Sequence, residues 1–277
     1  MILLGTIRFP PHERALDQGY MTEVVTPGFV NGLGISLWTE GDLALARAEV
    51  QPEFFKPGTD RVRMGVLATL VDMVAGSPAH AIINPTVDLR VTLLTPAPTS
   101  GVIELVTYPV KAGRLLFVGE TLLHTGDVAR PFARSVCTFM NKPLDSERTG
   151  IFPVGQLGAA HYDASLQVRE PDPGVFEMDN HDIVRNGANG TVQGGAQALL
   201  AELTGERALD AVDLTHEHHA VDLEIRYLNR VKNGPIRATG DVLPGGFDGP
   251  WVRVAMNEPP ADNRIVSLTT LQYRSVT

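Results

Sequence analysis

Gly65-Val-Leu-Ala-Thr-Leu-Val-Asp-Met-Val-Ala75 is the stretch that decides the fold of this chain. It predicts one helix that is apolar on nearly every face, and such a helix is buried. A single carboxylate, Asp72, lies in its middle. An isolated carboxylate in a buried helix costs several kcal/mol unless something offsets it. We therefore expect Asp72 to have an unusual pKa or an unusual role.

A second, looser copy of this helix occurs later in the chain. Residues 194–203 read Gly-Gly-Ala-Gln-Ala-Leu-Leu-Ala-Glu-Leu, with Glu202 at the place that corresponds to Asp72. The two acids are 130 positions apart, and the alternating runs that follow them, at 87–93 and 221–227, are 134 positions apart. Self-similarity on this scale indicates a duplicated domain.

Strand-like runs surround each helix. In the first half the sequence predicts a hairpin before the helix and four strands after it, at 35–38, 43–50, 87–93, 102–110, 115–124 and 129–141. In the second half it predicts a hairpin around Pro171-Asp-Pro173 and four later strands, at 165–169, 174–178, 221–227, 236–243, 251–257 and 265–276.

The limits of the helices and domains follow from proline and glycine positions. The first helix is expected from about residue 65 to about 82, unless Pro78 ends it earlier. The second is expected to end near Gly205. We therefore predict a first domain at 1–142, a linker rich in proline and glycine at 143–164, and a second domain at 165–277.

Composition and charge describe an ordinary globular protein. The chain has 277 residues, of which 43% are hydrophobic and 20% are charged. Its net charge of −9 argues against a nucleic-acid partner. No apolar run is long enough for a membrane span. The single cysteine, Cys137, cannot form an internal disulfide, so we expect a cytoplasmic location.

The starts of the two helices resemble a known motif. Gln193-Gly194-Gly195 precedes Glu202, and Arg63-Met64-Gly65 precedes Asp72 at the same spacing. This resembles the phenylacetate-pathway (PaaI-like) branch of hotdog acyl-CoA thioesterases, in which His-Gly-Gly opens the central helix and an acid follows nine residues after the histidine. The resemblance implies an α+β fold, a double hotdog of two tandem units, each with a central helix wrapped by an antiparallel sheet. It also implies hydrolysis of an acyl-CoA thioester, no cofactor besides the coenzyme A of the substrate, and a homodimer.

Thioester chemistry explains why such a motif is useful. Unpaired N–H groups at the start of a helix stabilise an oxyanion, and a glycine there lets the substrate carbonyl approach closely. An acid eight positions further on lies about 12 Å along the same helix, too far to act on that carbonyl. Two antiparallel helices side by side would bring each acid to the start of the other. The resemblance implies the same arrangement, with each site shared between two units.

Two sites are therefore expected. Site one joins Asp72, as general base or as nucleophile, to the amides of Gly194 and Gly195, with Gln193 as a hydrogen-bond donor in place of the histidine of the family. Site two joins Glu202 to the amides of Met64 and Gly65. Arg63 adds charge and Met64 adds bulk there. We therefore predict that site one works and that site two is weakened, altered or silent.

Simpler roles stay open for each candidate. Asp72 could be a hydrogen-bonded core acid, and Glu202 could be exposed near a helix end. Asn186 and Asn189 could position the thioester or a water, although asparagine also simply makes turns. Thr69 could line the acyl pocket or only pack in the core. Arg63, Met64 and Gly65 are the corresponding substrate-binding candidates of site two.

The sequence also bears on a metal site and on two other functions. His216-Glu-His-His219 resembles a metal cluster but has no suitably spaced carboxylate or cysteine partner, so no metal is expected. A hotdog enoyl-CoA hydratase or dehydratase typically pairs Asp with His at the helix start, and neither helix region contains a histidine. A non-catalytic acyl-CoA-binding protein stays open, because fold alone does not define function.

Overall fold

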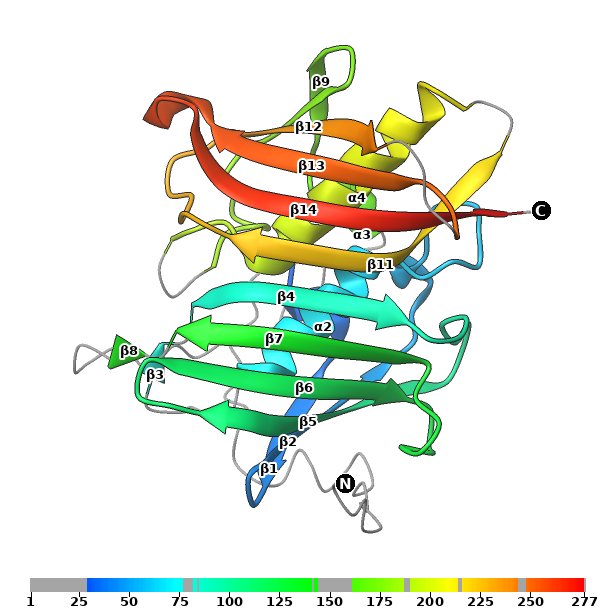
Figure 1. Cartoon of the computed structure of the whole chain (residues 1–277), viewed down its shortest axis with the longest axis vertical. Helices are drawn as coiled ribbons and strands as arrows, with labels where there is room; N and C mark the ends of the chain where they lie inside the picture. The colour runs from blue at the N-terminus through cyan, green and yellow to red at the C-terminus, as the bar shows by residue number, and fades with distance from the viewer. Residues whose placement is uncertain are drawn as a thin grey trace.

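A twelve-stranded antiparallel sheet with two helices packed against one face forms the body of this computed structural model (Figure 1). The structure describes residues 29–76, 82–83, 85–140, 142–143, 161–186, 190–213, 216–243 and 248–276. The strand order is β1-β2-β5-β6-β7-β4-β11-β14-β13-β12-β10-β9. Its first six strands come from the first half of the chain and its last six from the second half.

In the described part of the first half, the long helix is α2, at Met64–Ala75. The strands of its sheet are β1 (Ser36–Glu40), β2 (Leu43–Glu49), β4 (Thr86–Leu93), β5 (Val102–Ala112), β6 (Leu116–His124) and β7 (Ala133–Met140). The remaining elements are short: η1 (Asn31–Leu33), η2 (Pro52–Phe54), and β3 (Ile82–Ile83) paired with β8 (Lys142–Pro143).

The second half contains the longer helix α4, at Gly194–Asp210. The strands of its sheet are β9 (Arg169–Asp172), β10 (Val175–Met178), β11 (Glu217–Tyr227), β12 (Ile236–Leu243), β13 (Trp251–Glu258) and β14 (Arg264–Val276). Its short elements are α3 (Tyr162–Ser165) and η3 (Pro259–Ala261).

The two halves of the sheet are related by an approximate twofold axis at the strand pair β4–β11. Asp222 faces Thr92, and Arg226 faces Asp88. At the 134-residue offset of the repeat, Asp88 corresponds to Asp222 and Thr92 corresponds to Arg226. Each of the two facing pairs therefore corresponds to the other. The periodicity of the sequence is therefore also the symmetry of the sheet.

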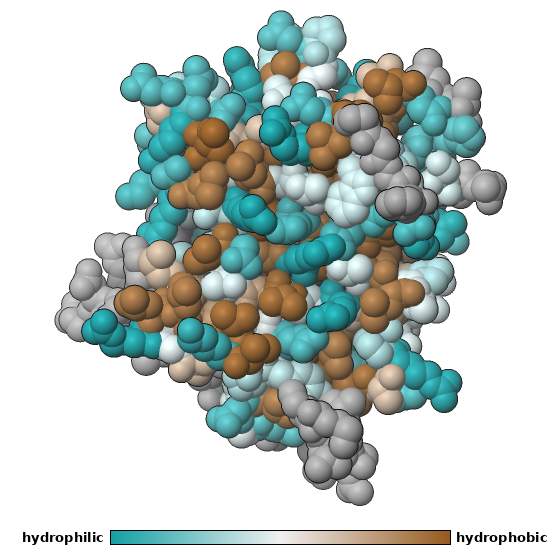
Figure 2. Space-filling view, in the orientation of Figure 1, coloured by the Kyte–Doolittle hydropathy of each residue, from teal (hydrophilic) through white to brown (hydrophobic). Residues whose placement is uncertain are grey.

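The two faces of the sheet differ in character. On the helix side, the central apolar residues of the two alternating runs, Leu89, Val91, Leu223 and Ile225, are fully buried. The opposite face carries exposed hydrophobic side chains over β6 and β7, among them Leu116, Val136 and Met140 (Figure 2). The site described below lies on the helix side.

Most of the predicted strands are confirmed. Helix α2 ends at Ala75, before Pro78 and well before residue 82. Three other expectations are wrong. Helix α4 continues to Asp210 rather than ending near Gly205. Gly205 lies in the middle of the helix, where a Cβ would meet the Tyr273 hydroxyl at 2.3 Å. Pro171 lies inside β9, an edge strand where proline is tolerated, and the turn falls at Pro173-Gly174. Ser165 belongs to α3 rather than to a strand. Pro78 and most of the predicted linker lie outside the described residues.

Helices α2 and α4 touch at two glycines. A Cβ on Gly65 would lie 2.5 Å from the Leu199 Cα, and a Cβ on Gly195 would lie 2.1 Å from the Thr69 Oγ1. Gly65 and Gly195 are equivalent under the 130-residue repeat, and so are Thr69 and Leu199. Both glycines are therefore required for the close packing of the helices, a role that the sequence interpretation did not give them.

Replacing these glycines by alanine is expected to destabilise the protein. Gly65→Ala and Gly195→Ala should each lower the free energy of unfolding by about 1–3 kcal/mol, because the added methyl overpacks the helix contact. Urea unfolding followed by circular dichroism measures this. Arg207→Ala, on the exposed side of α4, serves as the control and should change it by no more than about 0.5 kcal/mol. Wild-type stability in both glycine variants would contradict the close packing.

Candidate active site

The Asp72 carboxylate lies at the start of the other helix, as the spacing argument required. A Cβ added to Gly194 would be 3.4 Å from Asp72 Oδ2. The other carboxylate oxygen, Oδ1, accepts a hydrogen bond of 2.5 Å from the hydroxyl of Thr86, the first residue of β4. Thr86 therefore holds one oxygen of Asp72 while the second faces the first turn of α4.

Asp72 has the protonation behaviour of a base that works near neutral pH. Its side chain keeps partial access to solvent, whereas most of α2 is fully buried. Burial raises the pKa of Asp72 to about 6, and the hydrogen bond from Thr86 opposes this rise. A pKa close to the working pH is what general-base catalysis favours.

The first turn of α4 offers N–H groups for an anionic oxygen. Among the residues that the structure describes, no acceptor is found for the amides of Gly194 and Gly195. Helix starts leave such groups unpaired, and the helix dipole adds to their attraction for negative charge. The turn therefore has the chemistry of an oxyanion hole beside Asp72.

Gln193 caps this turn through its backbone position rather than its side chain. Its Nε2 donates a hydrogen bond of 3.2 Å to the carbonyl oxygen of Arg185. Its Oε1 is buried and has no partner in the described part of the chain. The side-chain amide of Gln193, expected to donate to the substrate, thus donates to Arg185 instead. The group that remains for a ligand is the acceptor Oε1.

Tyr227 and Thr86 were not predicted from the sequence. The Tyr227 hydroxyl donates a hydrogen bond of 3.0 Å to the carbonyl oxygen of Gly194. A Cβ on Gly194 would lie 3.0 Å from that hydroxyl, so a larger residue at this position would crowd the Tyr227 ring. The available signal was the alternation of 221–227, which places Tyr227 on the same face as buried Leu223 and Ile225. Thr86 gave no such signal.

The second acid, Glu202, is placed differently. It is 3% exposed, so the alternative of an exposed side chain near a helix end is wrong. Its Oε2 accepts a hydrogen bond of 2.8 Å from the Gly65 amide. Burial raises the pKa of Glu202 to about 7, against the opposing effects of Arg63 and of the Gly65 and Met64 amides. The carboxylate of Glu202 therefore fills the place at which site two would hold an oxyanion.

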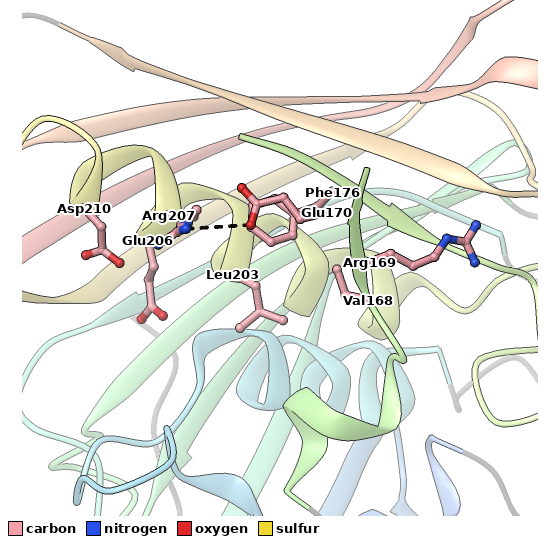
Figure 3. Close-up of a pocket in the computed structure, with 8 residues that line it drawn as sticks. All are labelled: Val168, Arg169, Glu170, Phe176, Leu203, Glu206, Arg207 and Asp210. Atoms are coloured by element: carbon pink, nitrogen blue, oxygen red, sulfur yellow. Dashed lines mark ion pairs between the residues drawn. The ribbon is translucent and has the colours of Figure 1, made fainter. Parts of the chain in front are cut away.

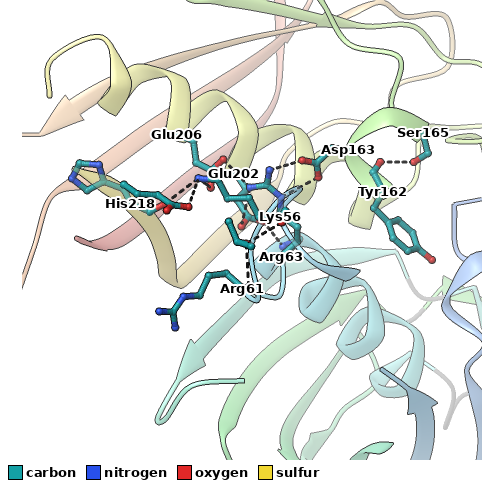
Figure 4. Close-up of polar contacts among 12 residues, drawn as sticks. Lys56, Arg61, Arg63, Tyr162, Asp163, Ser165, Glu202, Glu206 and His218 are labelled. Carbon is teal, nitrogen blue, oxygen red and sulfur yellow. Dashed lines mark hydrogen bonds and ion pairs between the residues drawn. The ribbon is translucent and has the colours of Figure 1, made fainter. Parts of the chain in front are cut away.

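Arg63 is the centre of a buried ion-pair cluster (Figure 4). Its side chain is 4% exposed and makes a two-pronged contact with Asp163, with Nε 3.0 Å from Oδ1. Its Nη1 lies 2.7 Å from Glu206 and 3.7 Å from Glu202. Lys56 approaches Glu206 to 3.4 Å. The predicted substrate-binding residue thus ties the start of α2 to α3 and α4.

The other site-two positions also differ from site one. Met64, at the place equivalent to Gly194, is fully buried. Under the 134-residue offset of the strands, Ala220 replaces Thr86 and Leu93 replaces Tyr227. Gly194, Thr86 and Tyr227 thus each have a different residue at the equivalent position of the other half, whereas Gly195 corresponds to Gly65.

The remaining candidates have local roles in the described structure. Thr69 is 1% exposed and donates to the Gly65 carbonyl at 2.6 Å while packing against Gly195, so it belongs to the helix contact. The Asn186 amide donates to Thr191, and its carbonyl accepts from the Gly190 amide, which forms a turn before α4. Asn189 lies outside the described residues.

An open groove of about 400 Å³ lies on the side of site two (Figure 3). It runs between α4 and the β9–β10 hairpin and is lined by Val168, Arg169, Glu170, Phe176, Leu203, Glu206, Arg207 and Asp210. Asp72 does not line it, whereas Glu206 belongs both to it and to the Arg63 cluster. The groove therefore ends at the ion pairs that fill site two.

Within the described ranges, no group of three or more His, Cys, Asp or Glu residues could hold a metal ion, and His216 instead lies 2.9 Å from Asp213. In the same ranges, no helix is long and apolar enough to cross a membrane.

Comparison with known proteins identifies the fold. No protein-family model and no curated protein matches the chain. Solved structures do. A conserved protein of unknown function with a hotdog fold from Alicyclobacillus acidocaldarius is 12% identical, with a TM-score of 0.61, over 91% of this chain and 99% of that one. The tesB protein of Mycobacterium avium subspecies paratuberculosis is 10% identical, with a TM-score of 0.64, over 90% and 98%.

An acyl-ACP thioesterase from Bacteroides thetaiotaomicron is a further similar structure. It is 13% identical, with a TM-score of 0.58, over 84% of this chain and 98% of that one. At such identities the likeness concerns the fold alone, and it spans nearly the whole of each neighbour. The chain has the hotdog fold.

Proposed function

We propose that this protein is an acyl-CoA thioesterase of the PaaI-like type, built as a double hotdog from two tandem units. One observation carries the proposal. The Asp72 carboxylate, whose pKa is raised to about 6, faces the first turn of α4, whose Gly194 and Gly195 amides have no acceptor among the described residues. The names of the neighbouring thioesterases add support from the fold.

The reaction follows from these groups. The thioester carbonyl oxygen accepts hydrogen bonds from the Gly194 and Gly195 amides, which stabilise the oxyanion as the carbon becomes tetrahedral. Asp72 removes a proton from a water molecule, whose oxygen forms the new C–O bond. The C–S bond then breaks, and the proton goes to the leaving thiolate. The products are a carboxylic acid and coenzyme A, and no other cofactor takes part.

Asp72 could instead attack the carbonyl itself and form a mixed anhydride that water then hydrolyses. The two routes differ in where the oxygen of water ends. In a single turnover in H₂¹⁸O, the general-base route places the label in the acid product. The anhydride route with water attack at Asp72 places it in the Asp72 carboxylate. Label found by mass spectrometry in the peptide that contains Asp72 therefore identifies the anhydride route, whereas label in the acid product alone is expected from the general-base route and also from water attack at the acyl carbon of the anhydride.

Site two is proposed to be silent. Glu202 already accepts the Gly65 amide, and Arg63 is held by three carboxylates. A thioester carbonyl would have to displace a buried carboxylate from its hydrogen bond and from its ion pair. The chain therefore keeps one working site of the two that duplication provides.

The function is tested by mixing the protein with a panel of acyl-CoA and acyl-ACP thioesters and measuring free thiol. Release of thiol supports hydrolysis. Loss of enoyl-CoA absorbance without thiol would identify a hydratase, and ligand binding without either reaction would identify a binding protein. A homodimer and a cytoplasmic location stay predictions from the sequence.

Hydrolysis is expected to lose rate in acid with a midpoint near pH 6. Below that pH Asp72 is protonated and cannot accept a proton, so kcat should fall about tenfold for each pH unit well below the midpoint and reach a plateau above pH 7. Measuring kcat from pH 4.5 to 8.5 with a stable substrate checks this. A kcat that stays constant down to pH 4.5 would contradict a raised pKa of the Asp72 carboxylate.

A further inference from the structure

Tyr227 touches the first turn of α4 from the sheet. Its hydroxyl donates to the Gly194 carbonyl at 3.0 Å. A Cβ at Gly194 would lie 3.1 Å from Tyr227 Cζ and 3.4 Å from Asp72 Oδ2. Tyr227 and Asp72 therefore lie against the same face of one glycine, and the ring fills space beside the carboxylate.

The other half of the chain lacks this arrangement. Leu93 stands at the position equivalent to Tyr227, and Met64 stands at the position equivalent to Gly194. Tyrosine and glycine thus occur together in the half that presents unpaired amides, and leucine and methionine occur together in the half that does not. The half with the larger strand residue, Tyr227, thus has the smaller residue, Gly194, at the start of its helix.

We propose that Tyr227 is a positioning residue for the reaction at site one, where its hydroxyl fixes the first turn of α4 and its ring excludes water from the side of Asp72. This inference rests on the proposed thioesterase function. A fixed turn keeps the amides directed at the substrate oxygen, and such preorganised donors contribute about 10²–10³-fold each to kcat in other enzymes. Tyr227 acts through Gly194 and Asp72 rather than on the substrate.

The groups around Asp72 make the shielding measurable. Thr86 approaches it from β4, the Tyr227 phenol from β11 and the Cys137 thiol from β7. The charge of Asp72 adds to the burial that raises the pKa of both Tyr227 and Cys137. Tyr227 can thus be replaced without removing the hydrogen bond that Thr86 donates to Asp72.

Two variants separate the hydroxyl from the ring. Tyr227→Phe keeps the ring and loses the hydrogen bond, so kcat should fall about tenfold with KM nearly unchanged and the acid midpoint still near pH 6. Tyr227→Leu introduces the residue of the other half, so kcat should fall further and the midpoint should move toward the ordinary aspartate value. Carbon-13 NMR titration of the Asp72 carboxyl reports that movement independently of turnover.

Tyr273→Phe is the matched control. Tyr273 is buried, and its hydroxyl donates at the same 3.0 Å to a carbonyl of α4, that of Glu202. Its loss should leave kcat and the acid midpoint unchanged. An inactive wild type would overturn the proposed function and this inference with it. An active wild type whose Tyr227→Phe variant keeps full kcat, or a Tyr227→Leu variant whose Asp72 midpoint does not move, would overturn the inference alone.

Discussion

Asp72→Asn is expected to lower kcat for thioester hydrolysis by about 10²–10⁴-fold, the range that general-base catalysis supplies. Asparagine has nearly the same shape and can still accept the hydrogen bond from Thr86 through its amide oxygen. It cannot accept a proton from water. The change therefore removes the base and leaves the surroundings in place. Thiol release from the best substrate of the panel, measured above pH 7, gives the value.

Glu202→Gln is the matched control for this experiment. The side-chain oxygen of glutamine can still accept a hydrogen bond from the Gly65 amide, so the start of α2 keeps its partner. Because site two is proposed to be silent, kcat should stay within about twofold of wild type. Equal losses in the two variants would show that both sites work. Full activity in Asp72→Asn would remove Asp72 from the mechanism.

The location of Asp72 could be predicted because it depends on regular geometry. An acid eight positions into a helix lies on the order of 12 Å from its start, so the only consistent arrangement crosses two helices. The repeat supplied the second helix and its Gly194-Gly195 start. Thr86 and Tyr227 could not be predicted in the same way, because their contacts with Asp72 and Gly194 depend on how each strand lies against each helix.

The glycines show where sequence interpretation assigns the wrong cause. Gly205 suggested a helix end, but it makes room for the Tyr273 ring in the middle of α4. Gly65 and Gly195 suggested close approach of a substrate, but both are needed where the helices touch. Only Gly194 faces Asp72. A glycine in the sequence does not indicate whether a ligand, an aromatic ring or another backbone occupies the space that its side chain would have filled.

Arg63 shows the limit set by distance along the chain. As a basic residue at a helix start it was a reasonable ligand for a substrate anion. Its two-pronged partner, Asp163, lies 100 residues away in a segment predicted to be a linker. No local pattern connects the two residues, so the cluster could not be predicted.

The second large effect is expected from Arg63→Met, which should lower the free energy of unfolding by about 3–5 kcal/mol while leaving kcat per folded molecule close to wild type. Removing the guanidinium leaves the buried carboxylates of Glu202 and Glu206 and the partner Asp163 without their common cation. Urea unfolding gives the change. Arg253→Met is the control, because Arg253 and Asp241 form an exposed pair, for which less than about 1 kcal/mol is expected.

The pH dependence of that loss tests its electrostatic origin. Without Arg63, the folded-state pKa of Glu202 should rise further above its unfolded value, because burial already raises it and Arg63 opposes the rise. A raised folded pKa means that stability is lost as pH rises through it. Arg63→Met should therefore be more destabilised at pH 8 than at pH 5.5, and adding Glu202→Gln should recover part of the loss at pH 8. An equal loss at both pH values would instead assign the stabilisation to the packing of the Arg63 side chain, and site two would then be filled for reasons of shape rather than of charge.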